Sequence, residues 1–150
     1  MNWDAVGSIA ELVGAFAVLL TLIYLATQMK QNNKQMQDDA TEALITQFNN
    51  FRLALLADGE VARIYIKGAE ANEELSPEES LRFRTAVGNV MSTMWGMHSR
   101  IQNGTVNLDL DYLEGLLSNM AASPGIVASW KEQRNTFPAE FREFADRHLT

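Results

Sequence analysis

The sequence contains no cysteine, and its 150 residues include only three prolines and nine glycines. Without cysteine, the chain cannot form a disulfide scaffold, a thiolate zinc site, an iron–sulfur site or a cysteine nucleophile. So little proline and glycine excludes a collagen-like or low-complexity chain. With 47% apolar residues the chain is too hydrophobic for intrinsic disorder, and its length suits one domain.

Positive charge is also scarce, because 12 Lys and Arg stand against 19 Asp and Glu. Phosphate contacts need clustered basic residues, so we expect no nucleic-acid partner. The sequence shows no Gly-rich phosphate loop, nucleophile elbow or metal-binding motif. The carboxylate pairs, such as Glu78 and Glu79, stand at predicted helix starts, where the helix dipole favours negative charge. We therefore expect no enzyme activity, no cofactor and no metal.

What the sequence does contain is a long uncharged run near its N-terminus. All the basic residues lie at or after Lys30, Leu12 to Met29 carries no charge over 18 residues, and Ala5 to Met29 carries only Glu11. At about 1.5 Å per residue, these two stretches span ~27 and ~37 Å as helices, against a hydrocarbon core of ~30 Å. The run predicts one transmembrane helix, with the lipid bilayer as its surroundings.

Two other interpretations of this run stay open, namely a buried core helix of a soluble bundle and a cleavable signal peptide. No basic residue precedes the run, as a signal peptide would require, so we expect an uncleaved signal anchor. Lys30 and Lys34 follow the run, whereas Asp4 and Glu11 lie on its N-terminal side. The positive-inside rule therefore predicts an external N-terminus and a cytoplasmic location for residues 30–150.

Helical signals continue beyond the run, and no β-hairpin signal appears. One helix is predicted from about Asp4 to Ala57, with Asp58-Gly59 as its stop. Further helices are predicted at 60–70, 76–102, 112–122, 126–136 and 138–148. The start signals are a capping box at Ser76-Pro77-Glu78-Glu79 and either Asp109 or Asp111 for the helix after it. Asn103-Gly104 and Ser123-Pro124 are predicted helix ends.

These elements predict an all-α fold, in which one N-terminal transmembrane helix extends into a cytoplasmic helical bundle. We expect residues 1–35 to form the transmembrane helix with its juxtamembrane extension. Residues 36–150 are expected to form the cytoplasmic all-α domain.

Three stretches at the two ends of the chain form a recognisable pattern: the opening Trp3-Asp4-Ala5-Val6-Gly7, the exit stretch from Tyr24 through Gln28-Met29-Lys30 to Asn32, and Trp130 to Arg134 followed by Phe137, Phe141 and Phe144. In these stretches the chain resembles a large family of uncharacterised bacterial proteins. The resemblance implies a single-pass protein of the bacterial inner (cytoplasmic) membrane and implies no catalytic activity.

Small or polar residues form a heptad stripe along the predicted span, and the stripe predicts a helix–helix interface. Its residues, at alternating spacings of three and four, are Gly7, Ala10, Gly14, Ala17 and Thr21, followed by Tyr24 and Gln28. Small side chains let helices approach closely in lipid. The partner is either another copy of the chain or a different membrane protein. Chance alignment in an Ala- and Gly-rich segment is the alternative.

Glu11 and Gln28 form a candidate intramembrane polar site, since carboxylates within a span usually face protein or water. The alternative is that Glu11 sits at headgroup depth, seven residues from Asp4. The sequence favours a membrane-anchored helical protein that acts by protein–protein association, as a homo-oligomer or an accessory subunit. The alternative function is a homo-oligomeric ion channel or transport component lined by the N-terminal helix, in which a ring of Glu11 would favour cations.

Two apolar stripes are predicted to lie in the core of the helical domain. Met91, Met94, Trp95 and His98 share one helical face, and so do Phe137, Phe141 and Phe144, which we group with Trp130. A cofactor or partner groove is the alternative for the first stripe, and an exposed docking surface is the alternative for the second.

Overall fold

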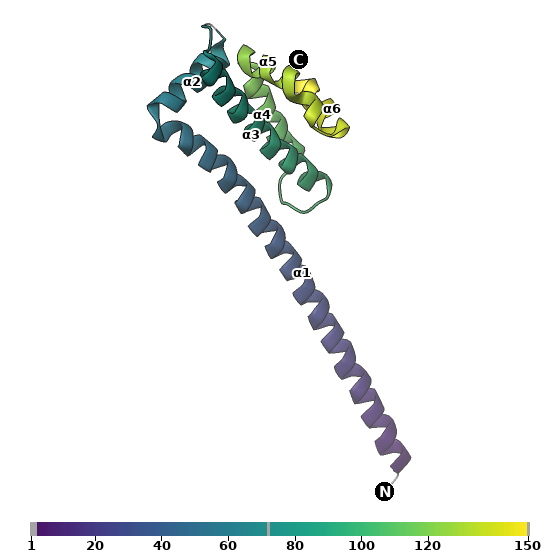
Figure 1. The fold of residues 1–150 in the computed structure, drawn as a ribbon. Coiled ribbons are helices and arrows are strands. Elements are labelled where there is room, and N and C mark those ends of the chain that lie inside the picture. Colours follow the sequence, from purple (N-terminus) through teal and green to yellow (C-terminus); the bar gives the residue numbers. More distant parts are fainter. Residues whose placement is uncertain (1–2, 72, 150) are drawn as a thin grey trace. The chain divides into compact units, whose positions relative to one another are not determined.

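The computed structural model describes residues 3–71 and 73–149, and these residues form helices without any strand. The helices, coloured along the chain in Figure 1, are α1 (Trp3–Ala57), α2 (Gly59–Glu70), α3 (Pro77–Gln102), α4 (Leu110–Ala121), α5 (Pro124–Gln133), the 3₁₀ helix η1 (Arg134–Thr136) and α6 (Ala139–Leu149). The predicted all-α class and the single long apolar helix at the N-terminal end are confirmed.

The chain forms two compact units, one ending at Asp38 and the other beginning at Asp39. The first unit is the N-terminal stretch of α1. The second unit, called the helical unit below, contains the rest of α1 together with α2 to α6. It is organised around one hydrophobic core, to which α1 contributes Leu44 as a buried residue and Ala40, Phe48 and Phe51 as partly buried ones.

A single residue, Asp58, separates α1 from α2. The helix end predicted at Asp58-Gly59 is therefore also the start of α2. The Asp58 carboxylate accepts hydrogen bonds from the backbone N–H groups of Glu60 and Val61, at 2.8 and 3.4 Å. An N-cap side chain in this role satisfies amide groups that the first helical turn leaves without partners. The helix buries Ile64 and Ala69 on the face that meets the core.

The capping box predicted at the start of α3 is present in full. The Glu79 backbone N–H donates to Ser76 Oγ at 3.2 Å, and the Ser76 N–H donates to Glu79 Oε2 at 2.9 Å. Pro77 occupies the first turn, where its missing N–H costs no hydrogen bond. At the other end, Gly104 has φ +62°, a conformation that glycine adopts without a steric penalty, and the predicted stop there is confirmed.

The boundaries of the last three helices differ from the prediction. Asp109, rather than Asp111, is the N-cap of α4, because its carboxylate accepts from the Tyr112 N–H at 3.2 Å. Pro124 begins α5 instead of only ending α4, since proline suits a first helical position. The helix predicted at 126–136 is α5 followed by the 3₁₀ turn η1.

Aromatic and methionine side chains fill the middle of the helical unit. Trp130, Phe137, Phe141 and Phe144 are all buried, so the core interpretation of these residues is confirmed. The shared helical face is wrong for Phe137, which lies before α6 in extended backbone, because Pro138 disfavours a helical conformation at the residue before it. Met91, Met94 and His98 are buried as well. The prediction is wrong for Trp95, which is 42% exposed and makes an edge contact with the ring of Phe137. A residue one position from Met94 lies about 100° around the helix, at the margin of the buried face.

Two glycines permit close contacts of α2 with its neighbours α5 and α3. A Cβ added at Gly125 would lie 1.7 Å from the Gly68 carbonyl oxygen, and one added at Gly68 would lie 2.5 Å from the Phe83 ring. Real Cβ contacts are never that short, so both positions require glycine. The packing of α5 on α2 therefore depends on the missing side chain of Gly125, and the packing of Phe83 from α3 on α2 depends on that of Gly68.

Candidate functional site

The residues of the predicted helix–helix interface all lie on the N-terminal stretch of α1, and all are exposed. They are Gly7, Ala10, Gly14, Ala17 and Thr21. A Cβ added at Gly7 or Gly14 would meet no described atom within 4 Å. No described residue therefore restricts the size of a side chain at these two glycines. A larger side chain there would clash only with a partner helix that packs against the stripe.

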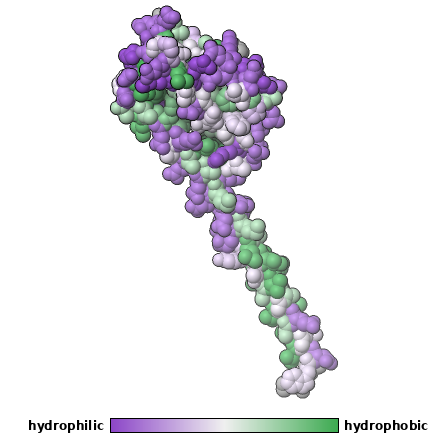
Figure 2. Space-filling model, viewed as in Figure 1, coloured by the Kyte–Doolittle hydropathy of each residue, from purple (hydrophilic) through white to green (hydrophobic). Residues whose placement is uncertain are grey.

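The same stretch exposes an unusual amount of apolar surface. Its most apolar window of 18 residues has a mean hydropathy of 2.2, and none of that window is buried. Figure 2 shows hydrophobic residues gathered along this stretch of α1. The exposed large side chains include Leu12, Val13, Phe16, Val18, Leu19, Leu20, Leu22, Ile23 and Leu25. Monomeric soluble proteins rarely expose contiguous apolar patches of more than a few hundred Å².

Hydroxyl groups in this stretch bond to the helix that carries them. Thr21 Oγ1 donates to the Ala17 carbonyl at 2.8 Å, and Thr27 Oγ1 donates to the Tyr24 carbonyl at 2.7 Å. Ser8 Oγ donates in the same way to the Asp4 carbonyl at 3.0 Å. A hydroxyl satisfied by its own backbone can enter an apolar medium without losing a hydrogen bond to water.

The candidate polar site is divided between two positions on α1. Glu11 is exposed and Gln28 is partly exposed. They are 17 residues apart, which is ~25 Å along a helix, so one helix cannot bring the two side chains together. Glu11 and Gln28 are therefore two separate positions along the helix and not one joint site.

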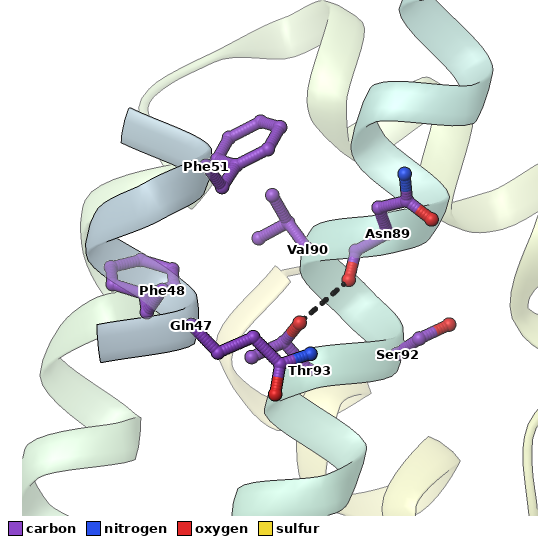
Figure 3. Close-up of a pocket in the computed structure, with 7 residues that line it drawn as sticks. All are labelled: Gln47, Phe48, Phe51, Asn89, Val90, Ser92 and Thr93. Carbon is purple, nitrogen blue, oxygen red and sulfur yellow. Dashed lines mark hydrogen bonds between the residues drawn. The ribbon is translucent and has the colours of Figure 1, made fainter. Parts of the chain in front are cut away.

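In the helical unit, one groove lies between α1 and α3. Phe48 and Phe51 on α1 and Val90 on α3 supply its apolar side chains, and Figure 3 shows Phe51 and Val90 pointing toward each other. Its polar members carry no charge: Gln47, Asn89, Ser92 and Thr93. The Thr93 hydroxyl already donates to the Asn89 carbonyl at 3.0 Å. This groove offers neither a charged group nor a nucleophile with an adjacent base.

A second groove, of about 490 Å³, brings together charged side chains from α4 and α6 beside His98 of α3. The His98 ring packs on Phe141 and Phe144, with centroids 5.8 and 4.7 Å away. Burial lowers the pKa of His98 below its usual range, while Glu140 opposes this shift and Arg147 adds to it. The imidazole is therefore neutral at physiological pH.

An ion-pair cluster on α2 and α3 was not foreseen from the sequence. Glu79 Oε1 accepts from Arg63 at 2.8 Å, and Glu79 Oε2 lies 3.2 Å from Lys67 Nζ. Together with the Ser76 N–H, these partners lower the pKa of Glu79 to about 2. Arg63 and Lys67 stand four residues apart, a spacing that puts both on one helical face. The sequence thus shows a basic face on this helix, but it contains no sign that this face lies against Glu79.

Comparison of the chain with protein-family models, with curated proteins and with solved structures finds no match. The resemblance of its two ends to a bacterial family stays a prediction.

Proposed function

We propose that this chain is a single-pass membrane protein that acts by protein–protein association and not by catalysis. In this proposal the N-terminal stretch of α1 spans the bacterial inner membrane with its N-terminus outside, and residues 30–150 are cytoplasmic. The observation that carries the proposal is the fully exposed apolar window within α1. In a bilayer, lipid surrounds a helix that is apolar on every side, so no other part of the protein is needed to cover that surface.

Three features support a membrane span over a core helix. A core helix is covered by its own protein, whereas none of this window is buried. The hydroxyls of Ser8, Thr21 and Thr27 are satisfied by their own helix. The first basic residues, Lys30 and Lys34, follow the window directly and suit the negatively charged cytoplasmic leaflet.

Association is the proposed mode of action because the span presents small side chains along one face. In lipid, helices associate by close packing, which Gly7, Ala10, Gly14, Ala17 and Thr21 permit. The partner is another copy of the chain or a second membrane protein, and Glu11 and Gln28 would then face that partner. The resemblance of both ends of the chain to a bacterial family supports the bacterial inner membrane as its location.

Membrane insertion is tested with two arginine substitutions at equally exposed leucines. Leu20→Arg lies within the span and Leu53→Arg lies in the helical unit, and these leucines are 63% and 60% exposed. An arginine at the centre of a span costs ~2.5–3.5 kcal/mol of insertion. We expect Leu20→Arg to move the chain out of the membrane fraction and Leu53→Arg to leave it there. Equal behaviour of the two variants, or a wild-type chain that is soluble without detergent, would refute the proposal.

Two further measurements address orientation and partner. Reporter fusions or protease protection should place the region after Lys30 in the cytoplasm, and a periplasmic C-terminus would contradict the topology. The mass of the complex in mild detergent distinguishes the two kinds of partner. A large mixed complex indicates that the chain is an accessory subunit. A defined ring of identical subunits would instead favour the channel alternative.

A further inference from the structure

His98 is a buried histidine at the place where α3 meets α6. The residue is only 6% exposed. Its ring lies 4.7 Å from the Phe144 ring and 5.8 Å from the Phe141 ring, measured between centroids. Both phenylalanines are buried residues of α6, so these three rings form an aromatic contact between the two helices. A positive charge on His98 would therefore arise within the core, where a charge without a partner is costly.

The carboxylates near His98 do not balance such a charge. Within residues 3–71 and 73–149, His98 takes part in no ion pair, whereas the other histidine, His148, lies 3.8 Å from Glu114. Glu114 on α4 and Glu140 and Glu143 on α6 line the groove beside His98. All three glutamates are at least partly exposed, so water screens their attraction for a buried cation.

The nearer of the two phenylalanine rings already has a cation as its neighbour. The Arg147 guanidinium lies over the Phe144 ring, 5.6 Å from its centroid, and His148 packs against the same ring at 5.3 Å. Protonated His98 would add a further cation to this ring. Burial lowers the pKa of His98, Glu140 partly offsets this effect, and Arg147 adds to it. The packed arrangement of α3 and α6 thus favours the neutral imidazole.

We propose that His98 is an acid-sensitive switch, whose protonation loosens α6 from α3 and uncovers the aromatic core of the helical unit. When α6 moves away, water reaches the imidazole, which then binds a proton with the ordinary histidine pKa of ~6.5. The packed state resists that proton, so acid favours the open state. The stability that neutral His98 provides is complete above pH ~6.5 and is lost as the pH falls from there through the lower pKa of the packed state. One helix can open in this way at a smaller cost in free energy than the whole unit.

The test measures amide hydrogen exchange in α6 and in α2, with the full chain in mild detergent. After correction for the intrinsic pH dependence of exchange, the opening of α6 should increase by up to about tenfold between pH ~7.5 and pH ~5.5. At one pH unit below 6.5, about ten protonated imidazoles stand against one neutral imidazole once His98 has left the core. The opening of α2, which lies outside this contact, should stay unchanged.

Variants of the two histidines assign the response to His98. His98→Phe and His98→Leu remove the titrating group but keep an apolar side chain, so either variant that folds should lose the acid response of α6. Near-ultraviolet circular dichroism confirms that the core of each variant is packed. His148→Gln is the matched control, because it removes the other histidine at the same Phe144 ring and should keep the response.

Nuclear magnetic resonance of ¹³C-labelled histidine follows the protonation of His98 directly. Its pKa should lie below ~6.5 in the wild-type chain, Arg147→Gln should raise it, and Glu140→Gln should lower it further. The proposal is overturned if His98 titrates at ~6.5 or above, or if α2 responds to acid as strongly as α6. It is also overturned if a folded His98 variant keeps the acid response, or if His148→Gln abolishes it.

Discussion

Trp130 and Asp146 are joined by a hydrogen bond between the indole and the carboxylate, which ties α5 to α6. Trp130 Nε1 donates to Asp146 Oδ1 at 2.8 Å, and Trp130 is fully buried. Arg134 also binds both oxygens of the same carboxylate. One aspartate therefore satisfies a buried donor and neutralises a cation at the point where η1 leads towards α6.

Removing this acceptor should destabilise the helical unit. Asp146→Ala leaves the buried indole N–H of Trp130 unpaired, which costs ~1–3 kcal/mol. Asp146→Asn should cost less, because its amide oxygen still accepts. Thermal unfolding in mild detergent, followed by near-ultraviolet circular dichroism, measures the difference. In a Trp130→Phe background the effect of Asp146→Ala should shrink, and an undiminished effect would show that the indole bond contributes nothing.

Phe141 should carry a large share of the core's stability. It is fully buried and packs against Trp130 at 5.9 Å and Phe137 at 5.7 Å between ring centroids. Phe141→Ala should therefore cost ~3–5 kcal/mol and leave the helical unit largely unfolded. Leu81→Ala, at an exposed apolar position, should change stability by less than about 0.5 kcal/mol. An unchanged unfolding midpoint for Phe141→Ala would contradict its place in the core.

Two Gly→Ala substitutions on the helical unit should have opposite effects. Gly125→Ala places a methyl group against the Gly68 carbonyl and should force α5 away from α2. Gly115→Ala meets open space in the middle of α4 and should stabilise by up to ~1 kcal/mol, because alanine favours the helix. Urea unfolding of the two variants under identical conditions provides the comparison. A stable Gly125→Ala variant would mean that the two helices do not approach as closely as described.

Glu79 should make the helical unit sensitive to acid. Its pKa is lowered to about 2 in the folded state, by the Ser76 N–H first and then by Arg63 and Lys67. The ionised form stabilises the fold above the unfolded-state pKa of ~4.3, and this contribution is lost as pH falls from there towards 2. Glu79→Gln should flatten the decline in unfolding midpoint over that range. Glu78→Gln, at an exposed neighbour paired with Arg82, should leave the decline unchanged.

The heptad stripe of small residues on α1 can be tested by making the same substitution at two nearby alanines, one on the stripe and one off it. Ala17→Ile lies on the stripe and should disrupt association, because a branched side chain separates the backbones. Ala15→Ile lies off the stripe and should not. Gly14→Ile and Leu19→Ile form a second such pair. Sedimentation in mild detergent reports the assembly, and equal assembly of the on-stripe and off-stripe variants would remove the stripe as the interface.

Local sequence signals sufficed wherever a few neighbouring residues determine the structure. The capping box at Ser76 to Glu79, the glycine turn at Gly104 and the helical spacing of Phe141 and Phe144 could all be recognised in advance. Each depends on backbone geometry or side-chain period within about two helical turns. The uncharged run before Lys30 belongs to the same class, because length and apolar character are properties of the chain alone.

Tertiary structure alone decided which of these helical faces meet. Gly68 and Gly125 look like ordinary helix residues until α2 lies on α5, and the sequence contains no sign that their backbones touch. Asp146 could be placed outside the apolar face of α6, but its bond to Trp130 depends on where α5 lies. His98 was predicted as a core residue, whereas the carboxylates that share its groove come from two other helices. Helical periodicity determines which way a side chain points along its own helix, whereas contacts between helices depend on how several helices fill one volume together.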